Sequence, residues 1–274
     1  MTGGALSREL KLRLTFMEQA SLFTGLTGAQ RYELALAARD RQCRRQEVLF
    51  SEGQPGLELF VLGTGRVKLT QLTPDGREVI LRLVGPAAVV GGLGLDGKDS
   101  YPATACALDT SHAIGWDRRI LERHMERIPA LQRNALRIAS EGLLHLQQRY
   151  IELATQKVPQ RLARALVRLA DDVGRPSDGG VLIPMTQEDL AQLVGTTVFS
   201  VCRILSHWES ERLLRTRREA VVLDDARCLL RVADDLPRLC PLTDAPLPPG
   251  CPMLVDRGSC PEEREDAASR DTSA

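Results

Sequence analysis

The chain has 274 residues, is 43% hydrophobic and carries 36 Lys and Arg against 36 Asp and Glu. This length is enough for two domains with cores of their own. No run of eighteen apolar residues occurs, and the first thirty residues lack the apolar stretch of a signal peptide, so we expect no membrane contact and a cytoplasmic location. The seven cysteines are then expected to be mostly reduced thiols.

Charge is distributed unevenly along the chain. Residues 224–274 hold 6 Lys and Arg against 11 Asp and Glu, which leaves 30 against 25 in residues 1–223. A mildly basic body with an acidic tail is compatible with a nucleic-acid partner, although this balance alone does not predict one.

The N-terminal half is predicted to be a small β domain preceded by helix. Residues 6–39 have a helical pattern, and short apolar runs then alternate with turns from Val48 to about Trp116. Turns such as Pro74-Asp75-Gly76 between runs of this length indicate antiparallel strands. The expected strands are 48–50, 59–62, 67–72 and 79–84.

A long helix is predicted from about Pro129 to Gln156, and it carries two apolar stripes. The first stripe is narrow, because its residues follow one another at steps of three and four positions, and this pattern is typical of two helices packed in parallel. The alternative is one amphipathic core helix. The first stripe contains Leu136, Ala139, Leu143, Leu146, Tyr150 and Leu153. The second stripe contains Ile128, Leu131, Ala135 and Ile138, and we expect it to pack on the β domain.

Two short helices joined by a tight turn are predicted between Thr186 and Ser210. Thr186 and Asp189 form a capping-box pattern, Gly195 permits a sharp turn, and Thr197 caps the second helix. The second helix has a buried side of Val201, Ile204, Leu205 and Trp208. Its opposite face, with Phe199, Arg203 and Ser206, is expected to project outward, as in a helix that enters the DNA major groove. The alternative is a helical hairpin in a core.

A basic segment and two strand candidates flank this pair of helices. Arg175–Gly180 has the composition of a turn cluster, and 181–184 and 220–223 are the strand candidates. Arginines 212, 215, 217 and 218 fall between the second helix and the second strand. This order is the outline of a winged helix whose wing contacts DNA phosphates, and the alternative is a solvated basic loop.

The order of motifs resembles the Crp/Fnr family of bacterial transcription regulators from about residue 20 to residue 234. The matching segments are Val48–Gly53, Gly65–Leu69, Gly91–Leu95, Val158–Ala163 and Leu190–Leu205. The resemblance implies an α+β protein with an antiparallel β-roll of the cyclic-nucleotide-binding type, a dimerisation helix and a winged helix-turn-helix. The expected regions are 1–128 (β-roll with N-terminal helix), 129–157 (dimerisation helix), 158–234 (DNA-binding domain) and 235–274 (Pro- and Cys-rich acidic tail without a fold of its own).

The family's effector pocket would fall in this chain on Gly91, Gly92, Leu93, Tyr101, Leu146 and Gln147. Members that bind cyclic AMP have a Glu where Gly92 stands and an Arg near Tyr101. A buried phosphate without a guanidinium partner is costly, and Lys98 is not a bidentate substitute, so cyclic AMP is disfavoured. The segment from Ser100 to Ala105 looks more like branches of the family that sense redox state, oxygen or nitric oxide.

The expected DNA-binding residues are Thr186, Thr197, Val198, Phe199, Ser200, Arg203, Arg215 and Arg217. Many family members place a Glu four residues before the Arg that matches Arg203, and here that position is Phe199. A phenyl ring packs on a thymine methyl but cannot accept a hydrogen bond from cytosine, so an unusual half-site is expected.

Four cysteines near the C-terminus are candidate metal ligands: Cys228, Cys240, Cys251 and Cys260. The last three precede prolines, as do some iron–sulfur and haem ligands, but the spacing matches no compact zinc motif. An iron–sulfur cluster or haem and an incidental role for these cysteines both stay open.

The function implied is that of a regulator, with an activator as the expected kind, which binds a palindromic promoter site as a homodimer and works with RNA polymerase. The signal would be sensed in the β-roll or the tail. Two alternatives keep the same architecture: a cyclic-nucleotide-responsive regulator, and a constitutive regulator with a vestigial pocket. The sequence has no constellation of acid, base and nucleophile, so no enzyme is expected.

Overall fold

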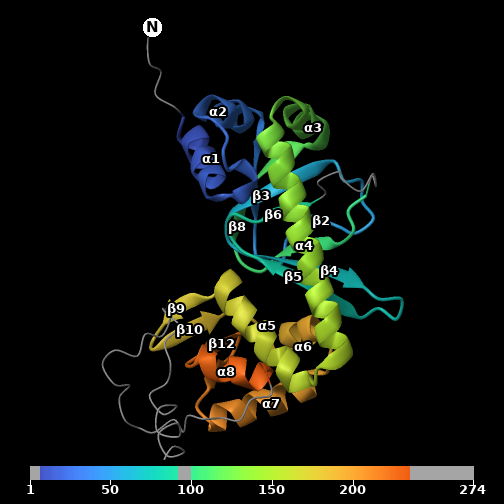
Figure 1. Ribbon diagram of the computed structural model, residues 1–274, viewed down its shortest axis with the longest axis vertical. Coiled ribbons are helices and arrows are strands. Elements are labelled where there is room, and N and C mark those ends of the chain that lie inside the picture. Colours follow the sequence, from blue (N-terminus) through green and yellow to red (C-terminus); the bar gives the residue numbers. More distant parts are fainter. Residues whose placement is uncertain (1–6, 92–99, 235–274) are drawn as a thin grey trace, which may run out of the picture. The chain divides into compact units, whose positions relative to one another are not determined.

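The computed structural model describes residues 7–91 and 100–234. Two helices and a short turn between them begin this part of the chain and form its helical cap (Figure 1). The side chain of Ser7 accepts from the first turn of α1, and a full capping box of Thr27 and Gln30 starts α2. The cap consists of α1 (Arg8–Gln19), the 3₁₀ turn η1 (Ser21–Phe23) and α2 (Gly28–Ala37).

Two four-stranded antiparallel sheets follow and form the β-roll. The first has the order β1 (Arg39–Cys43), β8 (Ser111–Asp117), β3 (Glu58–Thr64) and β6 (Val89–Gly91). The second has the order β2 (Val48–Phe50), β7 (Thr104–Ala107), β4 (Val67–Leu72) and β5 (Glu78–Val84). The four strands predicted from the sequence therefore exist, with bounds within two residues of those expected.

Two strands lie at positions where the sequence pattern favours another structure. The first is β1, whose opening residue falls at the end of the predicted helical region; its segment Arg-Asp-Arg-Gln-Cys is exposed at all but the last position. Antiparallel pairing with β8 makes this polar segment a strand at the edge of its sheet. The second is β9 (Arg175–Ser177), which falls in the predicted turn cluster and pairs with β10 (Gly180–Ile183).

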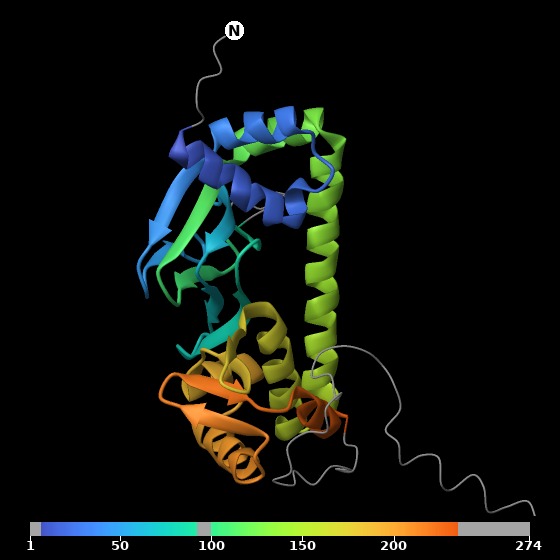
Figure 2. The ribbon, with the colours of Figure 1, turned by 90° about the vertical axis from the view of Figure 1, so that its left-hand side faces the viewer.

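Helix α3 (Arg118–Arg127) leads into α4 (Pro129–Thr155), which has Pro at its first turn, where no intrahelical N–H is needed. Figure 2 shows α4 running beside the β-roll. Its second apolar stripe packs on the β domain as predicted: Leu131 and Ala135 are fully covered, Ile138 is half-buried, and they share a core with the helical cap and Trp116 of β8. None of the helices described is long and apolar enough to cross a membrane.

The last part is the winged helix. It consists of α5 (Val158–Val173), β9, β10, α6 (Gln187–Val194), α7 (Val198–Ser210), β11 (Leu214–Arg217), β12 (Ala220–Leu223) and α8 (Ala226–Ala233). Its four strands have the order β11, β12, β10, β9. Trp208 lies at the centre of its core and is 1% exposed. That core also takes in Ile80 and Leu83 of β5, so the β-roll and the winged helix share buried apolar surface.

Candidate nucleic-acid interface

The turn between α6 and α7 is built from local hydrogen bonds that the sequence predicts. The hydroxyl of Thr186 accepts from the Asp189 amide at 3.0 Å, and the Asp189 carboxylate accepts from the Thr186 amide at 3.3 Å. Helix α6 ends at Gly195 in the left-handed region, with φ 71° and ψ 54°. The hydroxyl of Thr197 then accepts from the Ser200 amide at 3.2 Å and starts α7. The predicted caps are confirmed.

Arg161, which the sequence does not single out, holds this turn from outside. From the first turns of α5 it donates to the carbonyl groups of Val194 at 3.4 Å and Gly195 at 3.5 Å. It also donates to Gln156, at the end of α4, at 2.9 Å. The guanidinium therefore ties the helix-turn-helix to the junction of α4 and α5. In the sequence its signal is its place in the segment Val158–Ala163, directly after the long helix.

Helix α7 has one buried and one open face. Val201, Leu205 and Trp208 are at most 1% exposed, whereas Phe199 is 77% exposed. Arg203 and Ser206 are also exposed and lie on the same side as Phe199, because they follow it at steps of four and three residues. The predicted outward face is therefore open to a ligand. Its three side chains offer a flat apolar ring, a guanidinium fork and a small hydroxyl.

The wing is joined to α7 by Glu209. Its carboxylate accepts from the amide and the hydroxyl of Thr216 in β11, both at 2.8 Å. Arg217 and Arg218 at the end of this hairpin are exposed. Arg215, expected on the DNA-facing side, instead donates to the Asp224 carboxylate at 2.6 Å and to the Asp178 carbonyl at 2.7 Å. In the wing, therefore, Arg217 and Arg218 are available to solvent and Arg215 supports the hairpin.

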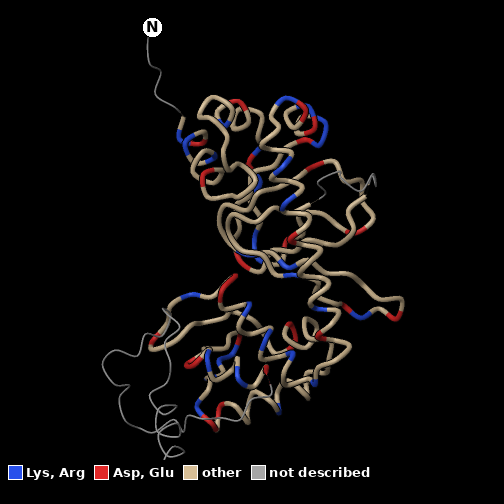
Figure 3. Tube along the Cα trace, viewed as in Figure 1, with Lys and Arg blue, Asp and Glu red and all other residues tan. Residues whose placement is uncertain are grey.

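The order of charges along the chain does not distinguish α7. In Figure 3, positions of Lys and Arg alternate with positions of Asp and Glu along the trace of the β-roll and of the winged helix alike. What distinguishes α7 is the exposure of one of its faces.

The first apolar stripe of α4 is exposed. Leu136 is 61%, Leu143 66%, Leu146 56%, Tyr150 74% and Leu153 52% exposed. Five large apolar side chains in one row of a helix form the kind of surface that a second helix covers.

The expected effector residues are only partly brought together. The Tyr101 ring stacks on Phe50 with centroids 3.9 Å apart, and its hydroxyl donates to the Glu58 carbonyl at 2.9 Å and accepts from the Glu58 amide at 3.1 Å. Burial raises the pKa of Tyr101, so this hydroxyl stays protonated. A Cβ on Gly91, whose φ is 104°, would lie 2.9 Å from the Glu58 carbonyl oxygen. Tyr101 and Gly91 thus meet at Glu58.

The other expected effector residues lie elsewhere. Leu146 and Gln147 are exposed on α4. Gly92, Leu93 and Lys98 are outside the described residues. A hollow between the β-roll and α4 has a volume of about 90 Å³ and is lined by other residues, among them Arg82, Ile138, Glu141 and His145.

Of the candidate metal ligands, only Cys228 is within the described residues. It lies on α8, partly buried, and packs against the core of the winged helix. Cys240, Cys251 and Cys260 lie outside the described residues. Residues 7–91 and 100–234 contain no group of three or more His, Cys, Asp or Glu side chains that could hold a metal ion.

A β-roll joined by a long helix to a winged helix with an open second helix defines a DNA-binding protein with a sensor-type domain. Two family models agree: residues 40–127 match the cyclic nucleotide-binding domain, and residues 160–232 match the Crp-like helix-turn-helix domain. The chain belongs to the Crp/Fnr family of transcriptional regulators. Membership of this family implies DNA binding and a dimeric architecture.

Three relatives illustrate the similarity. The chain is 28% identical to the CRP-like cAMP-activated global transcriptional regulator of Mycobacterium tuberculosis, over 79% of this chain and 98% of that protein. It is 30% identical to the transcriptional regulator LdrP of Thermus thermophilus, over 69% and 94%. A solved structure of a CRP-family regulator from Thermus thermophilus is 25% identical with a TM-score of 0.63, over 72% of this chain and 97% of that one.

Proposed function

We propose that a homodimer of this chain binds an inverted repeat in promoter DNA and inserts α7 of each protomer into the major groove. The observation that carries this proposal is the open face of α7, with Phe199 77% exposed above a fully buried opposite face. A second helix held rigidly across a first, with its outer face free, is the shape that fits the groove. The family supports the same role.

Within α7 we assign base reading to the exposed face. Arg203 has the planar fork that pairs with the O6 and N7 atoms of guanine. Phe199 has no hydrogen-bonding group, and its ring suits the methyl group of thymine. Thr197, Val198 and Ser200 stand at the helix start, where amide groups and hydroxyls reach phosphates. Thr186 plays the corresponding part at the start of α6.

In the wing we assign phosphate contacts to Arg217 and Arg218 and remove Arg215 from the contact set. Arg215 already has a bidentate carboxylate partner, and Asp224 raises its pKa through a hydrogen bond and its charge. A phosphate would have to displace that partner. Arg215 then acts by holding β11 and β12 together.

Dimerisation is assigned to the exposed stripe of α4. One recognition helix contacts too few base pairs for useful specificity, and a twofold pair of protomers reads a palindrome. The stripe runs along the helix at the spacing of a two-stranded coiled coil, which supports this pairing. The regions 1–128, 129–157 and 158–234 then have separate tasks of sensing, pairing and binding DNA, with 235–274 as an appended tail.

For the signal, we propose that the β-roll does not respond to cyclic AMP, although the Mycobacterium tuberculosis relative is described as cAMP-activated. The position expected for a phosphate-binding arginine is Tyr101, and its hydroxyl is already occupied by the backbone of Glu58. In place of cyclic AMP, we propose redox or gas sensing by the cysteines of the tail, with an iron–sulfur cluster or haem. We further propose activation through RNA polymerase, a cytoplasmic location where promoter DNA is found, and no catalytic activity.

The experiment is a selection of DNA sites by the full-length protein from a random library, followed by sequencing of the bound fraction. An inverted repeat with half-sites separated by one helical turn, about 10 base pairs between centres, is the expected result. Enrichment of single half-sites or of no motif would refute the dimeric reading of DNA. Sedimentation of the DNA-free protein gives its stoichiometry independently.

A further inference from the structure

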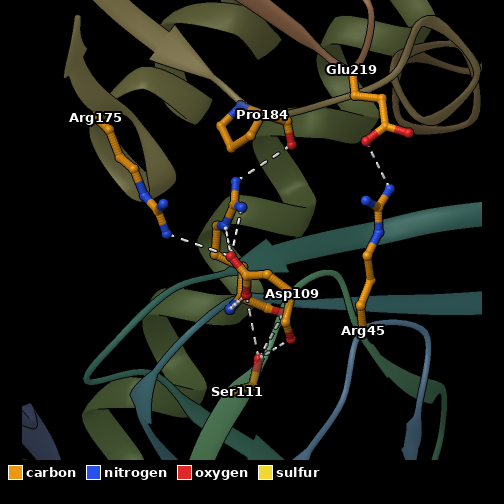
Figure 4. Close-up of polar contacts among 7 residues, drawn as sticks. Arg45, Asp109, Ser111, Arg175, Pro184 and Glu219 are labelled. Carbon is orange, nitrogen blue, oxygen red and sulfur yellow. Dashed lines mark hydrogen bonds and ion pairs between the residues drawn. The ribbon is translucent and has the colours of Figure 1, made fainter.

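The β-roll and the winged helix meet along a line of charged and polar groups, which we call the polar seam. Figure 4 shows its contacts around Asp109 and between Arg45 and Glu219. The seam consists of Arg45, Arg66, Lys68 and Asp109 from the β-roll, and of Arg175, Pro184, Asp189 and Glu219 from the winged helix.

The centre of the polar seam is a buried arginine. Arg66, 8% exposed, donates through Nε and Nη2 to one Asp109 oxygen at 2.8 and 2.6 Å. Its Nη1 donates to the carbonyl of Pro184 at 3.5 Å. That carbonyl stands two residues before Thr186, the cap of α6. A residue of the β-roll therefore contacts the backbone that leads into the helix-turn-helix.

Lys68 lies in β4, two residues after Arg66, which directly precedes that strand. Its Nζ is 3.0 Å from a Glu78 oxygen and 3.7 Å from Oδ1 of Asp189, whose other oxygen accepts from Thr186. Burial lowers the pKa of Lys68, but the hydrogen bond and charge of Glu78 and the charge of Asp189 outweigh it and raise that pKa. The ammonium is thus charged beside the cap of α6.

Two exposed ion pairs extend the polar seam toward the wing. Arg175 of β9 is 3.5 Å from Asp109, and Arg45 is 2.9 Å from Glu219. Glu219 directly follows Arg217 and Arg218, the two arginines assigned to phosphate. An acid at this place repels DNA unless a cation neutralises it, and Arg45 of the β-roll supplies that cation.

The closed polar seam leaves the DNA-facing side of α7 open. The contacts of the polar seam given above do not involve Phe199, Arg203 or Ser206, and Phe199 is 77% exposed. The polar seam therefore does not cover the face that we assign to base reading.

We propose that Arg45, Asp109, Arg175 and Glu219 are positioning residues, which hold the winged helix on the β-roll in the orientation that matches the spacing of the two half-sites. This inference rests on the proposed function. Two recognition helices read a palindrome only when their separation is fixed, and that separation depends on how each winged helix sits on the dimerised part of the chain.

The most informative variant is Glu219→Gln, because the two possible roles of Glu219 predict opposite changes in operator affinity. If Glu219 only repels DNA, its neutralisation strengthens operator binding. If it holds the polar seam, the same change weakens binding by about 2–5-fold, the range of an exposed ion pair. Arg45→Gln should cause a similar loss, and the double variant should lose no more than the more affected single one. The control is Glu188→Gln, an exposed acid of α6 outside the seam, which should bind equally well or more tightly.

The preference for one spacing of the half-sites is a second measurement. It should stay unchanged if the residues of the polar seam only stabilise the fold. Arg45→Gln with Arg175→Gln should reduce, by about threefold or more, the preference for the native operator over one lengthened by a base pair. Arg39→Gln with Arg44→Gln removes the same charge from exposed positions outside the seam and should keep the preference. Equal preference in both double variants, or tighter binding by Glu219→Gln, overturns the proposal.

Amide hydrogen exchange of the DNA-free protein separates failure of this inference from failure of the proposed function. Opening the polar seam should speed exchange at the start of α6, around Thr186 to Leu190, while α7 stays protected by its core. Unchanged exchange in Arg45→Gln with Arg175→Gln overturns the seam even if the wild type binds an inverted repeat. Faster exchange supports the seam even if no operator is found.

Discussion

The winged helix and the β-roll differ in how their functional surfaces are made. In the winged helix the candidate site is one face of one helix, and a period of 3.6 residues decides which side chains share it. In the β-roll the expected pocket needs Gly91, Tyr101 and the middle of α4, which are separated by 10 and 45 residues in the chain. Local periodicity therefore identifies a recognition helix well. A pocket assembled from distant segments depends on tertiary packing, which local sequence patterns do not predict.

The largest effect is expected from the two buried tryptophans, Trp208 in the core of the winged helix and Trp116 in the core that the helical cap, the β-roll and α4 share. Trp208→Ala and Trp116→Ala should each lower the free energy of unfolding by about 3–5 kcal/mol. Trp116 should cost more, because its indole N–H donates to the Leu34 carbonyl at 2.8 Å, which would be left unpaired. Urea unfolding followed by circular dichroism measures both. A loss below about 1 kcal/mol for either would contradict the assigned core.

Dimerisation through α4 is tested by charge. Leu146→Glu places like charges opposite each other across a twofold axis, which costs several kcal/mol and weakens the dimer at least about 100-fold. Leu143→Glu should act in the same way. Gln148→Glu adds the same charge on a different side of α4 and should leave the sedimentation profile unchanged. If Leu146→Glu remains a dimer at the wild-type concentration, another surface mediates pairing.

The alkylation rates of two cysteines give a finer comparison of the β-roll with the winged helix. Burial raises the pKa of Cys106 in β7, while Cys202 lies exposed on α7. A raised pKa keeps the thiol protonated up to a higher pH, and only the thiolate is alkylated. At pH 7 we expect the exposed Cys202 to react with iodoacetamide at least about threefold faster than Cys106. Peptide mass spectrometry follows both sites, and equal rates at pH 7 would remove the difference in environment.

The smallest expected effect is none at all. Cyclic AMP added at micromolar concentrations should give no heat in calorimetry and no change in operator affinity, because its phosphate would lose water without gaining a matched cation. Binding that disappears in Tyr101→Phe or Lys98→Ala would show that this loop recognises the nucleotide in another way. In that case redox or gas sensing would lose its main support.

The caps of α6 and α7, the buried side of α7 and strand β12 could all be predicted because each depends on residues within a few positions of one another. Strand β1 could not, since a polar segment becomes a strand only through its partner β8. The place of Arg215 in a basic run predicts a DNA contact, but Asp224, nine residues away across the hairpin, holds it. The contacts of Arg161 with Val194 and of Arg45 with Glu219 were likewise outside the reach of local patterns, because the partners lie 33 and 174 residues apart in the chain.

If the outer face of α7 reads bases, the loss of Arg203 must weaken binding in a way that depends on the base pair it contacts. Affinities of wild type and Arg203→Ala are measured on the selected operator and on one with the contacted G·C pair replaced by A·T. We expect Arg203→Ala to bind the first operator about 1–3 kcal/mol more weakly than the wild type does. On the second operator, which lacks the guanine, the two proteins should bind almost equally, so that the effects of the two changes are not additive. Unchanged affinity of Arg203→Ala, or an equal loss on every sequence, would contradict base reading by this face.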